Sequence, residues 1–481
     1  MPTGNSMRHR RFNARQLSAV LLVASIGSLA ACNQDQLLTV PTPDVVLPEN
    51  LTGASVLPNA YAAAIGDFQV AYAGSGGNVT GTFGSTEGLV IMSGMLSDEL
   101  LNAETFPTRL EVDRRATKEV NSTMLAIFQL AQRARATAEL VAGSYAQFEP
   151  ANPNRAEVLA LAGFTYILFA EDYCNGVPSS RINADGTFTY GDPQTGTQLL
   201  TNAVAKFDSA ITLATAAGSG GATALNLARI GKGRALLDLN NPVAAAAAVA
   251  AVPSTFVYNI NHDENTPRQY NGVYTFTVTS KRFTVADKEG GNGINFVTTN
   301  DPRVPVVRTT TGFDASTPFY RTPKYTSLAQ SPSRGAPTPL ALGTEARLIE
   351  AENALRAGDA VTFLAKLNDA RVNAKTYSDA PVPPAALTPI LVTDLPADDI
   401  GRQNLLFRER AYDLYLTSHR LGDLRRLIKQ YTRNAETVFP TGAYNPLGAA
   451  AGNNYGPDVN LPIPFEETNN PQYKACIDRS A

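Results

Sequence analysis

The sequence predicts a mainly α-helical protein, in which paired helices form a scaffold and a loop-rich insertion carries a few short strands. Apolar residues recur at three- and four-residue spacing in two segments, about 118–252 and about 343–435, which is the period of an amphipathic helix. Between them, residues 253–342 are rich in proline and alternate aromatic with polar residues, as short strands do. A hydrophobic content of 44% in 481 residues suffices for a large core.

The first scaffold segment predicts a series of consecutive helices. One begins after Asn121 and a second begins at Asn154, while two more are expected over 196–216 and 222–239. Asn240-Asn241-Pro242 then ends one helix and opens the alanine-rich stretch 243–251. Helices of about 17 to 22 residues joined by short turns are similar to tetratricopeptide hairpins, although no strict repeat survives.

The remaining segments alternate between loops and helices. Six glycines in residues 74–88 predict a loop, and helices resume at Gly343 until Gly358-Asp359 separates them from a helix over 361–373. A proline-rich loop over 381–396 precedes the last long helix, over 398–417. Within the insertion, short strands are predicted from the alternation of Tyr270, Tyr274, Phe276, Val278 and Phe283.

The N-terminus predicts export from the cytoplasm. Four arginines precede a short apolar run over 17–30, which describes a secretory signal peptide and is too short for a permanent membrane helix. Leu29-Ala30-Ala31-Cys32 resembles the bacterial lipobox, in which the cysteine is acylated and becomes the first mature residue; the alternative is an ordinary signal peptide that a cysteine happens to follow. We therefore expect a signal peptide over 1–31, a lipidated tether over 32–60 and one domain over 61–481.

Charge and cysteine content limit the partners. The chain has 40 basic and 43 acidic residues, so removing the arginine-bearing leader leaves a net charge of about −7. Such a charge favours neither nucleic acid nor an anionic lipid surface, and the lipid on Cys32 is the expected membrane attachment. The other cysteines, Cys174 and Cys476, are expected to form a disulfide in an oxidising compartment, or else remain two buried thiols.

Motifs for catalysis, metal or nucleotides are not evident. The charged run Glu409, Arg410, Asp413, Arg420 and Asp423 could suggest acid–base chemistry, but its spacing favours structural ion pairs. The two histidines of the mature chain have no metal-ligand spacing, and Gly231-Lys232-Gly233 lacks the other residues of a phosphate loop. Neither a metal nor a cofactor is therefore predicted.

Several motifs together resemble the SusD/RagB family. Glu409-Arg410-Ala411-Tyr412-Asp413-Leu414, followed by His419-Arg420-Leu421-Gly422-Asp423-Leu424-Arg425-Arg426, is similar to its C-terminal signature. Residues 156–178 and 346–373, and Leu461-Pro462-Ile463-Pro464 with Asn470-Pro471, are similar to further family segments in the family's order. Thr417, Ser418 and Leu421 depart from the signature, and the chain has no tryptophan, which puts any indole-based sugar platform in doubt.

The resemblance implies a helical, SusD-like fold and a non-catalytic role. Family members are outer-membrane lipoproteins, exposed at the cell surface, that capture nutrient oligomers, mostly oligosaccharides and in some cases peptides. They act as a lid over a TonB-dependent, SusC-like transporter. The alternatives are a protein-interaction scaffold, or a secreted hydrolase with a carboxylate pair such as Asp98 with Glu99 or Glu104.

The ligand surface is expected on loops outside the scaffold, in residues 97–115 and 264–325. Aromatic side chains there could stack on sugar rings, and polar side chains could bind hydroxyls, although each could also pack locally. The candidate residues are Asp98, Glu99, Phe106, Arg109, Tyr270, Tyr274, Arg303, Phe319, Tyr320, Arg321 and Tyr325.

Overall fold

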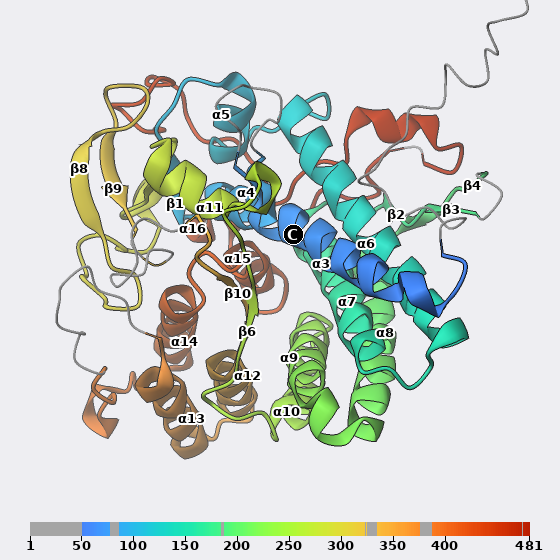
Figure 1. Cartoon of the computed structure of the whole chain (residues 1–481). Helices are drawn as coiled ribbons and strands as arrows, with labels where there is room; N and C mark the ends of the chain where they lie inside the picture. Colours follow the sequence, from blue (N-terminus) through green and yellow to red (C-terminus); the bar gives the residue numbers. More distant parts are fainter. Residues whose placement is uncertain are drawn as a thin grey trace, which may run out of the picture. The chain divides into compact units, whose positions relative to one another are not determined.

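Paired helices form the scaffold in the computed structural model of this chain (Figure 1). Most scaffold helices pack against the next one along the chain, as expected for helices joined by short connections. In the first segment these are α6 (Ser122–Phe148), α7 (Asn154–Asp172), α8 (Gly196–Ala216), α9 (Ala222–Asp238) and α10 (Pro242–Val249). In the second they are α12 (Gly343–Arg356), α13 (Ala360–Asn373), α14 (Asp399–Asp413) and α15 (Arg420–Lys429).

The structure describes residues 51–76, 86–183, 187–322, 324, 334–375, 387–473 and 475–481. All of them belong to the second of two units into which the chain divides, Met1–Val45 and Val46–Ala481. The expected signal peptide, the acylation site Cys32 and the candidate Tyr325 lie outside the described residues.

Side-chain caps explain where several helices begin. The Asn121 side chain accepts hydrogen bonds from the backbone N–H groups of Thr123 and Met124 at the start of α6. Thr195 and Gln198 form a reciprocal capping box before α8. Asn241 caps α10, whose first residue is a proline that needs no hydrogen-bond acceptor. These local signals confirm the predicted starts of α6 and α10.

Close helix contacts explain the glycines around Lys232. A Cβ on Gly231 would overlap the ring of Phe207 on α8, and a Cβ on Gly163 of α7 would meet the same ring. A Cβ on Gly233 would overlap the side chain of Val249 on α10. The glycines therefore let neighbouring helices approach closely, which agrees with the expectation that this motif is not a phosphate loop.

The strands form short antiparallel pairs, three of which involve the insertion. β1 (Leu100–Asn102) pairs with β7 (Phe283–Val285), β6 (Val257–Ile260) with β10 (Thr338–Leu342), and β8 (Val307–Thr311) with β9 (Pro318–Arg321). Two further pairs, β2 (Val177–Pro178) with β5 (Pro193–Gln194) and β3 (Arg181–Ile182) with β4 (Phe188–Thr189), form a hairpin after α7.

Three sequence predictions need correction. Residues 270–278, predicted as strands, form the helical turns α11 (Gly272–Tyr274) and η5 (Thr275–Thr279), because the Asn271 side chain caps the Tyr274 N–H. Helix α3 (Leu57–Ala73) begins inside the segment predicted as a tether, with Pro58 in its first turn. The helix predicted over 398–417 ends at Asp413, and Leu416 and Ser418 then adopt left-handed conformations before α15.

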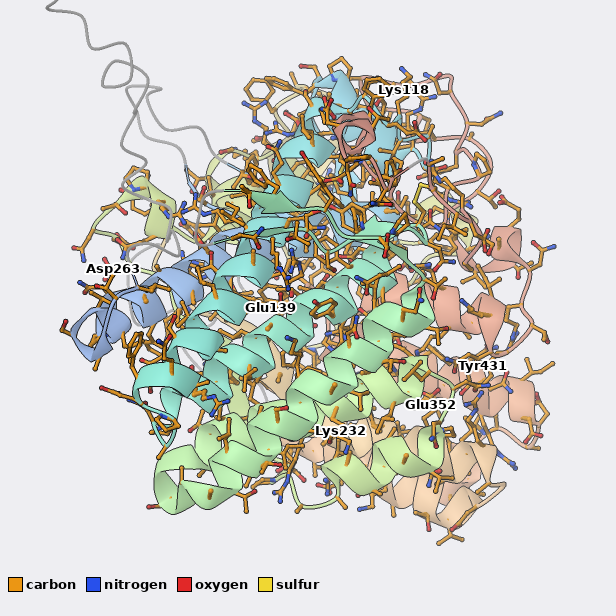
Figure 2. The ribbon with its side chains drawn as sticks, turned by 90° about the vertical axis from the view of Figure 1, so that its right-hand side faces the viewer. Lys118, Glu139, Lys232, Asp263, Glu352 and Tyr431 are labelled. Atoms are coloured by element: carbon orange, nitrogen blue, oxygen red, sulfur yellow. A yellow bond between two sulfur atoms is a disulfide. The ribbon has the colours of Figure 1, made fainter. Side chains whose placement is uncertain are left out.

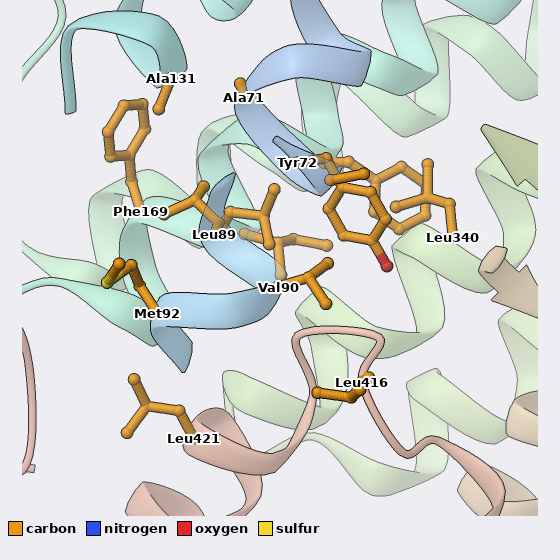
Figure 3. Close-up of a cluster of buried hydrophobic side chains, with 14 of the residues drawn as sticks. Ala71, Tyr72, Leu89, Val90, Met92, Ala131, Phe169, Leu340, Leu416 and Leu421 are labelled. Carbon is orange, nitrogen blue, oxygen red and sulfur yellow. The ribbon is translucent and has the colours of Figure 1, made fainter. Parts of the chain in front are cut away.

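A buried helix lies at the centre of the core. α4 (Gly88–Leu96) is buried along its whole length, and Figure 3 shows its Leu89, Val90 and Met92 among side chains from α3, α7, β10 and α15. Tyr72 on α3 is also fully buried there, and its hydroxyl donates to the backbone carbonyls of Pro339 at 2.8 Å and Thr417 at 3.0 Å. The core therefore joins the N-terminal helices to the strands and to the segment after α14.

A disulfide joins the C-terminal segment to the scaffold. Cys174, two residues after α7, is bonded to Cys476, 302 residues further along the chain. Adjacent backbone contacts support it, since the Cys174 N–H donates to the Leu461 carbonyl and the Asn175 N–H to the Asp478 carbonyl. The predicted pairing is confirmed.

Candidate functional site

The charged motif at 409–426 forms a buried ion-pair network. Arg410 Nε lies 2.7 Å from Asp423 Oδ2, and Arg426 Nη2 lies 2.8 Å from Asp423 Oδ1. Glu352 on α12 pairs with Arg426 at 2.5 Å and accepts the Tyr431 hydroxyl at 2.7 Å (Figure 2). Burial by itself raises the pKa of Asp423, but the two arginines outweigh it and hold this pKa well below its ordinary value. The predicted structural pairing is confirmed.

Asp98 and Glu99 lie in the interior, where they hold the segment before α15. Arg420 binds both carboxylate oxygens of Asp98, at 2.5 and 2.8 Å, and the Ile294 N–H donates to Asp98 at 2.8 Å. Glu99 accepts the Leu416 N–H at 2.8 Å, and burial raises the pKa of Glu99 to about 8. Neither side chain is exposed, so neither is placed to contact a ligand at the surface.

Other candidates are also buried. Arg303 is 2% exposed and pairs at 2.8 Å with both Asp301 and Glu409, so its guanidinium is occupied by internal carboxylates. Tyr274 is 3% exposed because the turn of α11 directs it inward, and Phe319 is fully buried on β9. Ligand contact by these three residues is not supported, since none reaches the surface.

Three candidates are partly buried. Arg334 covers the ring of Tyr270, with its guanidinium carbon 5.0 Å from the ring centre. Tyr320 packs against the core from β9, and its backbone N–H donates to Thr284 Oγ1 at 2.7 Å. Arg321 ends the same strand and is half-buried. These three residues therefore contribute more to the packing of the loops than to their exposed surface.

Phe106 reaches the surface, in a group of aromatic and guanidinium side chains, whereas only 12% of the Arg109 side chain is exposed. Phe106 is 48% exposed, and Phe313 is 52% exposed. The Arg282 guanidinium carbon lies 5.2 Å from the Phe106 ring centre and 3.5 Å from that of Phe313, while that of Arg109 lies 5.0 Å from Phe106. We call Phe106, Arg109, Arg282 and Phe313 the aromatic patch.

A buried carboxylate fixes both guanidinium groups of the aromatic patch. Glu104 is fully buried and accepts Arg109 Nη1 at 2.8 Å on one oxygen and Arg282 Nη1 at 2.6 Å on the other. Glu87 forms a second ion pair with Arg109. These ion pairs hold both guanidinium groups in place before any ligand binds. Each arginine therefore loses little further side-chain entropy on binding.

Strand pairing brings the aromatic patch together from distant parts of the sequence. The Ala103 N–H donates to the Arg282 carbonyl where β1 meets β7, and the Phe313 N–H donates to the Lys281 carbonyl. The whole patch falls in the predicted segments 97–115 and 264–325. Sequence patterns suggest Glu104 only as a possible hydrolase carboxylate, and they do not single out Arg282 or Phe313. Arg282 and Phe313 are distinguished only by their contacts with each other and with Phe106, which depend on long-range strand pairing.

A second candidate region is a cavity of about 470 Å³ between residues 293–301 and helices α13 and α14. Its lining includes Tyr412, whose hydroxyl donates to the Asn295 carbonyl at 3.2 Å, together with Thr299 and the guanidinium groups of Arg371 and Arg408. An aromatic ring surrounded by a few polar groups is a common lining for ring-shaped polar ligands.

The described residues contain neither a metal-binding cluster nor a membrane-spanning helix. No group of three or more histidine, cysteine or acidic side chains in these ranges is arranged to hold a metal ion. No helix within them is both long enough and apolar enough to span a membrane.

Comparison with known proteins identifies the fold. No family model matches the chain, and no curated protein matches it. A solved SusD superfamily protein from Bacteroides fragilis superposes with a TM-score of 0.61 over 87% of this chain and 99% of that one, at 12% identity. Surface glycan-binding protein A from Bacteroides uniformis gives 0.60 over 88% and 99%, at 13% identity.

A third similar structure is a SusD-like carbohydrate-binding protein from Bacteroides vulgatus, with a TM-score of 0.57 over 78% of this chain and 83% of that one, at 14% identity. The chain therefore has a SusD-like fold. This confirms the resemblance drawn from its motifs, and the predicted helical architecture.

Proposed function

We propose that this protein is a glycan-binding protein of SusD type, which captures oligosaccharides without cleaving them. The observation that carries the proposal is the aromatic patch, where two half-exposed phenyl rings lie beside guanidinium groups that a buried carboxylate holds in place. Solved structures with this fold include a surface glycan-binding protein and a SusD-like carbohydrate-binding protein.

The chemistry of the aromatic patch suits a sugar ring. The apolar face of a pyranose stacks on an aromatic ring, and guanidinium N–H groups donate to hydroxyl oxygens. Because the patch has phenyl rings and no indole, each contact buries limited area, so we expect a Kd in the roughly micromolar to millimolar range, or about −8 to −4 kcal/mol.

Weak capture is sufficient if the ligand passes to a neighbouring protein. The proposal therefore includes acylation at Cys32, location at the outer-membrane surface, and transfer of the oligosaccharide to a TonB-dependent, SusC-like transporter. Attachment beside such a partner raises the effective ligand concentration at its entrance. Recovery of a TonB-dependent barrel with the membrane-anchored protein in mild detergent would support this part of the proposal.

A glycan array with the mature chain, followed by calorimetry on any glycan it identifies, tests the binding role. Phe106→Ala and Phe313→Ala should each weaken binding about fivefold, because a lost aromatic contact costs about 1 kcal/mol. Phe465→Ala is the matched control, since Phe465 is 54% exposed and lies outside the patch, and it should bind as the unchanged protein does.

Two outcomes would overturn the proposal. If both patch variants bind the glycan as tightly as the unchanged protein does, the aromatic patch is not the binding site. The cavity beside Tyr412 then becomes the candidate site. Release of shortened products from the bound glycan on prolonged incubation would show that the protein hydrolyses the glycan instead of only binding it.

A further inference from the structure

The cavity beside Tyr412 differs from the aromatic patch in the charge that it presents to a ligand. Its walls come from residues 293–301 and from α13 and α14, which pack against each other (Figure 1). Its volume of about 470 Å³ lies within the range of ligand sites and suits one end of an oligosaccharide. It shares no lining residue with the aromatic patch.

The carboxylates of this cavity are buried and already paired. Asp301 is 8% exposed, and Arg303 binds both of its oxygens, through Nε at 2.9 Å and Nη2 at 2.8 Å. Glu409 is 2% exposed, and its Oε2 accepts Arg303 Nη1 at 2.8 Å and Arg371 Nη1 at 2.7 Å. Burial by itself raises the pKa of Asp301, but the hydrogen bonds and charge of Arg303 outweigh it and hold this pKa below its ordinary value. Little negative charge is therefore open to a ligand.

The guanidinium groups that line the cavity are more exposed than its carboxylates. The Arg408 side chain is 54% exposed, and its one ion pair within the described residues joins Nη2 to Glu409 Oε1 at 3.7 Å, beyond hydrogen-bond distance. Arg371 is held by Glu409 and by the Thr388 carbonyl, which accepts its Nε at 2.7 Å, and its side chain remains 18% exposed. A ligand in this cavity therefore meets positive charge, whereas at the aromatic patch Glu104 binds both guanidinium groups.

Uncharged polar groups line the rest of the cavity. Asn295 is exposed, and its side-chain amide has no hydrogen-bond partner among the residues that the structure describes. Thr299 is exposed in the same segment, which the Tyr412 hydroxyl binds to α14 through the Asn295 carbonyl at 3.2 Å. Amide and hydroxyl groups each donate to and accept from sugar hydroxyls. The lining therefore fits a ring that carries hydroxyl groups and one negative charge.

We infer that this cavity binds a uronic acid residue, so that acidic oligosaccharides are among the ligands of this protein. The sugar carboxylate lies against Arg408 and Arg371, because a planar carboxylate matches the fork of a guanidinium group. The ring hydroxyls lie towards Asn295 and Thr299. The net charge of −3 on the chain opposes this little, since salt screens charges beyond about 8 Å. The inference rests on glycan capture as the proposed function, but not on the aromatic patch as its site.

Pairs of glycans that differ only in charge test this inference. The probes are oligosaccharides of galacturonic, glucuronic and mannuronic acid, each with its methyl ester, measured by calorimetry on the mature protein. At least one acid should bind, and its ester should bind at least roughly tenfold more weakly, because esterification removes the charge and keeps the ring. Added salt should weaken binding of the acid and leave binding of the ester unchanged.

Two variants separate the contact with the charge from the contacts with the hydroxyls. Arg408→Ala should weaken the acid roughly tenfold and leave the ester nearly unchanged, so that the preference for the acid is lost. Asn295→Ala should weaken both probes roughly threefold, because it removes hydrogen bonds to the ring. Both side chains are exposed, so both variants should fold. The matched control is Arg181→Ala, because Arg181 on β3 is an exposed arginine outside the cavity, and it should leave binding of both probes unchanged.

Three results would overturn the inference. They are no binding of any uronic acid oligosaccharide, equal binding of acid and ester, and an unchanged preference for the acid in Arg408→Ala. If a neutral glycan binds at the aromatic patch and no acidic glycan binds, the uronic acid site is refuted and the proposed function stands. If no glycan of any kind binds, the proposed function itself is refuted.

Discussion

Arg420→Ala is the most direct test of the buried ion-pair network. Arg420 is 5% exposed and binds Asp98 through two nitrogens, at 2.5 and 2.8 Å, across a separation of 322 residues. Asp98 is fully buried, and the Ile294 N–H is its remaining donor. Replacing the arginine leaves a buried carboxylate with one hydrogen bond and no opposite charge.

The expected cost follows from that imbalance. Removing one partner of a buried ion pair costs about 3–5 kcal/mol, because the remaining charge stays desolvated or must take up a proton. Since whole domains are stable by only about 5–15 kcal/mol, we expect Arg420→Ala to lose about 4 kcal/mol and a large part of the folded state's stability. Asp98→Asn should cost a similar amount, because it leaves the buried Arg420 unpaired.

Urea unfolding followed by circular dichroism measures the effect. The double variant should be more stable than the sum of the two single losses, with a coupling of about 1–3 kcal/mol, since it leaves no unpaired charge. Lys118→Ala is the control, because the Lys118 side chain is 70% exposed and pairs with Glu111 at 2.8 Å, and it should change stability by at most about 1 kcal/mol. A loss below about 1 kcal/mol for Arg420→Ala, or strictly additive losses, would refute the reasoning.

Four further predictions concern other parts of the chain. Burial raises the pKa of Asp113 from 3.8 to about 7, so between these pH values the folded state binds one proton more than the unfolded state. The unfolding free energy should therefore fall by about 1.4 kcal/mol per pH unit as the pH rises from about 4 to about 7. Urea midpoints of Asp113→Asn, measured over the same pH range, should lack this contribution. Reducing Cys174–Cys476, which encloses a 302-residue separation, should lower the unfolding free energy by about 3–5 kcal/mol; an unchanged midpoint in reductant would argue against a structural role. Gly231→Ala should cost about 2 kcal/mol in the same assay, because its Cβ would overlap a neighbouring aromatic ring. Cys32→Ser should abolish lipid incorporation and membrane partitioning, since only a thiol accepts the lipid; partitioning equal to that of the unchanged protein would contradict acylation there.

The sequence by itself determined the features that depend on local patterns. Apolar periodicity predicted the helices α8 and α9 with nearly their observed bounds, and the capping residue Asn121 marked the start of α6. The charged motif at 409–426 also predicted ion pairing, because its composition and spacing were visible along the chain. Helix periodicity and capping act over a few residues, so neighbours in sequence suffice to specify them.

Only the tertiary structure decided which polar loop residues face solvent. Asp98, Glu99 and Arg303 look like surface residues in a loop, yet each is buried because partners from distant elements satisfy its charge or hydrogen bonds. The cost of burying a charge depends on those partners, and the sequence does not say which carboxylate will meet which arginine.

The same reason explains the candidate sites. Phe106 becomes part of a patch only because β1 pairs with β7 and brings Arg282 beside it, with Phe313 on the following hairpin. Local periodicity specified the helices, whereas the surfaces they create arise from long-range contacts whose partners no local pattern identifies.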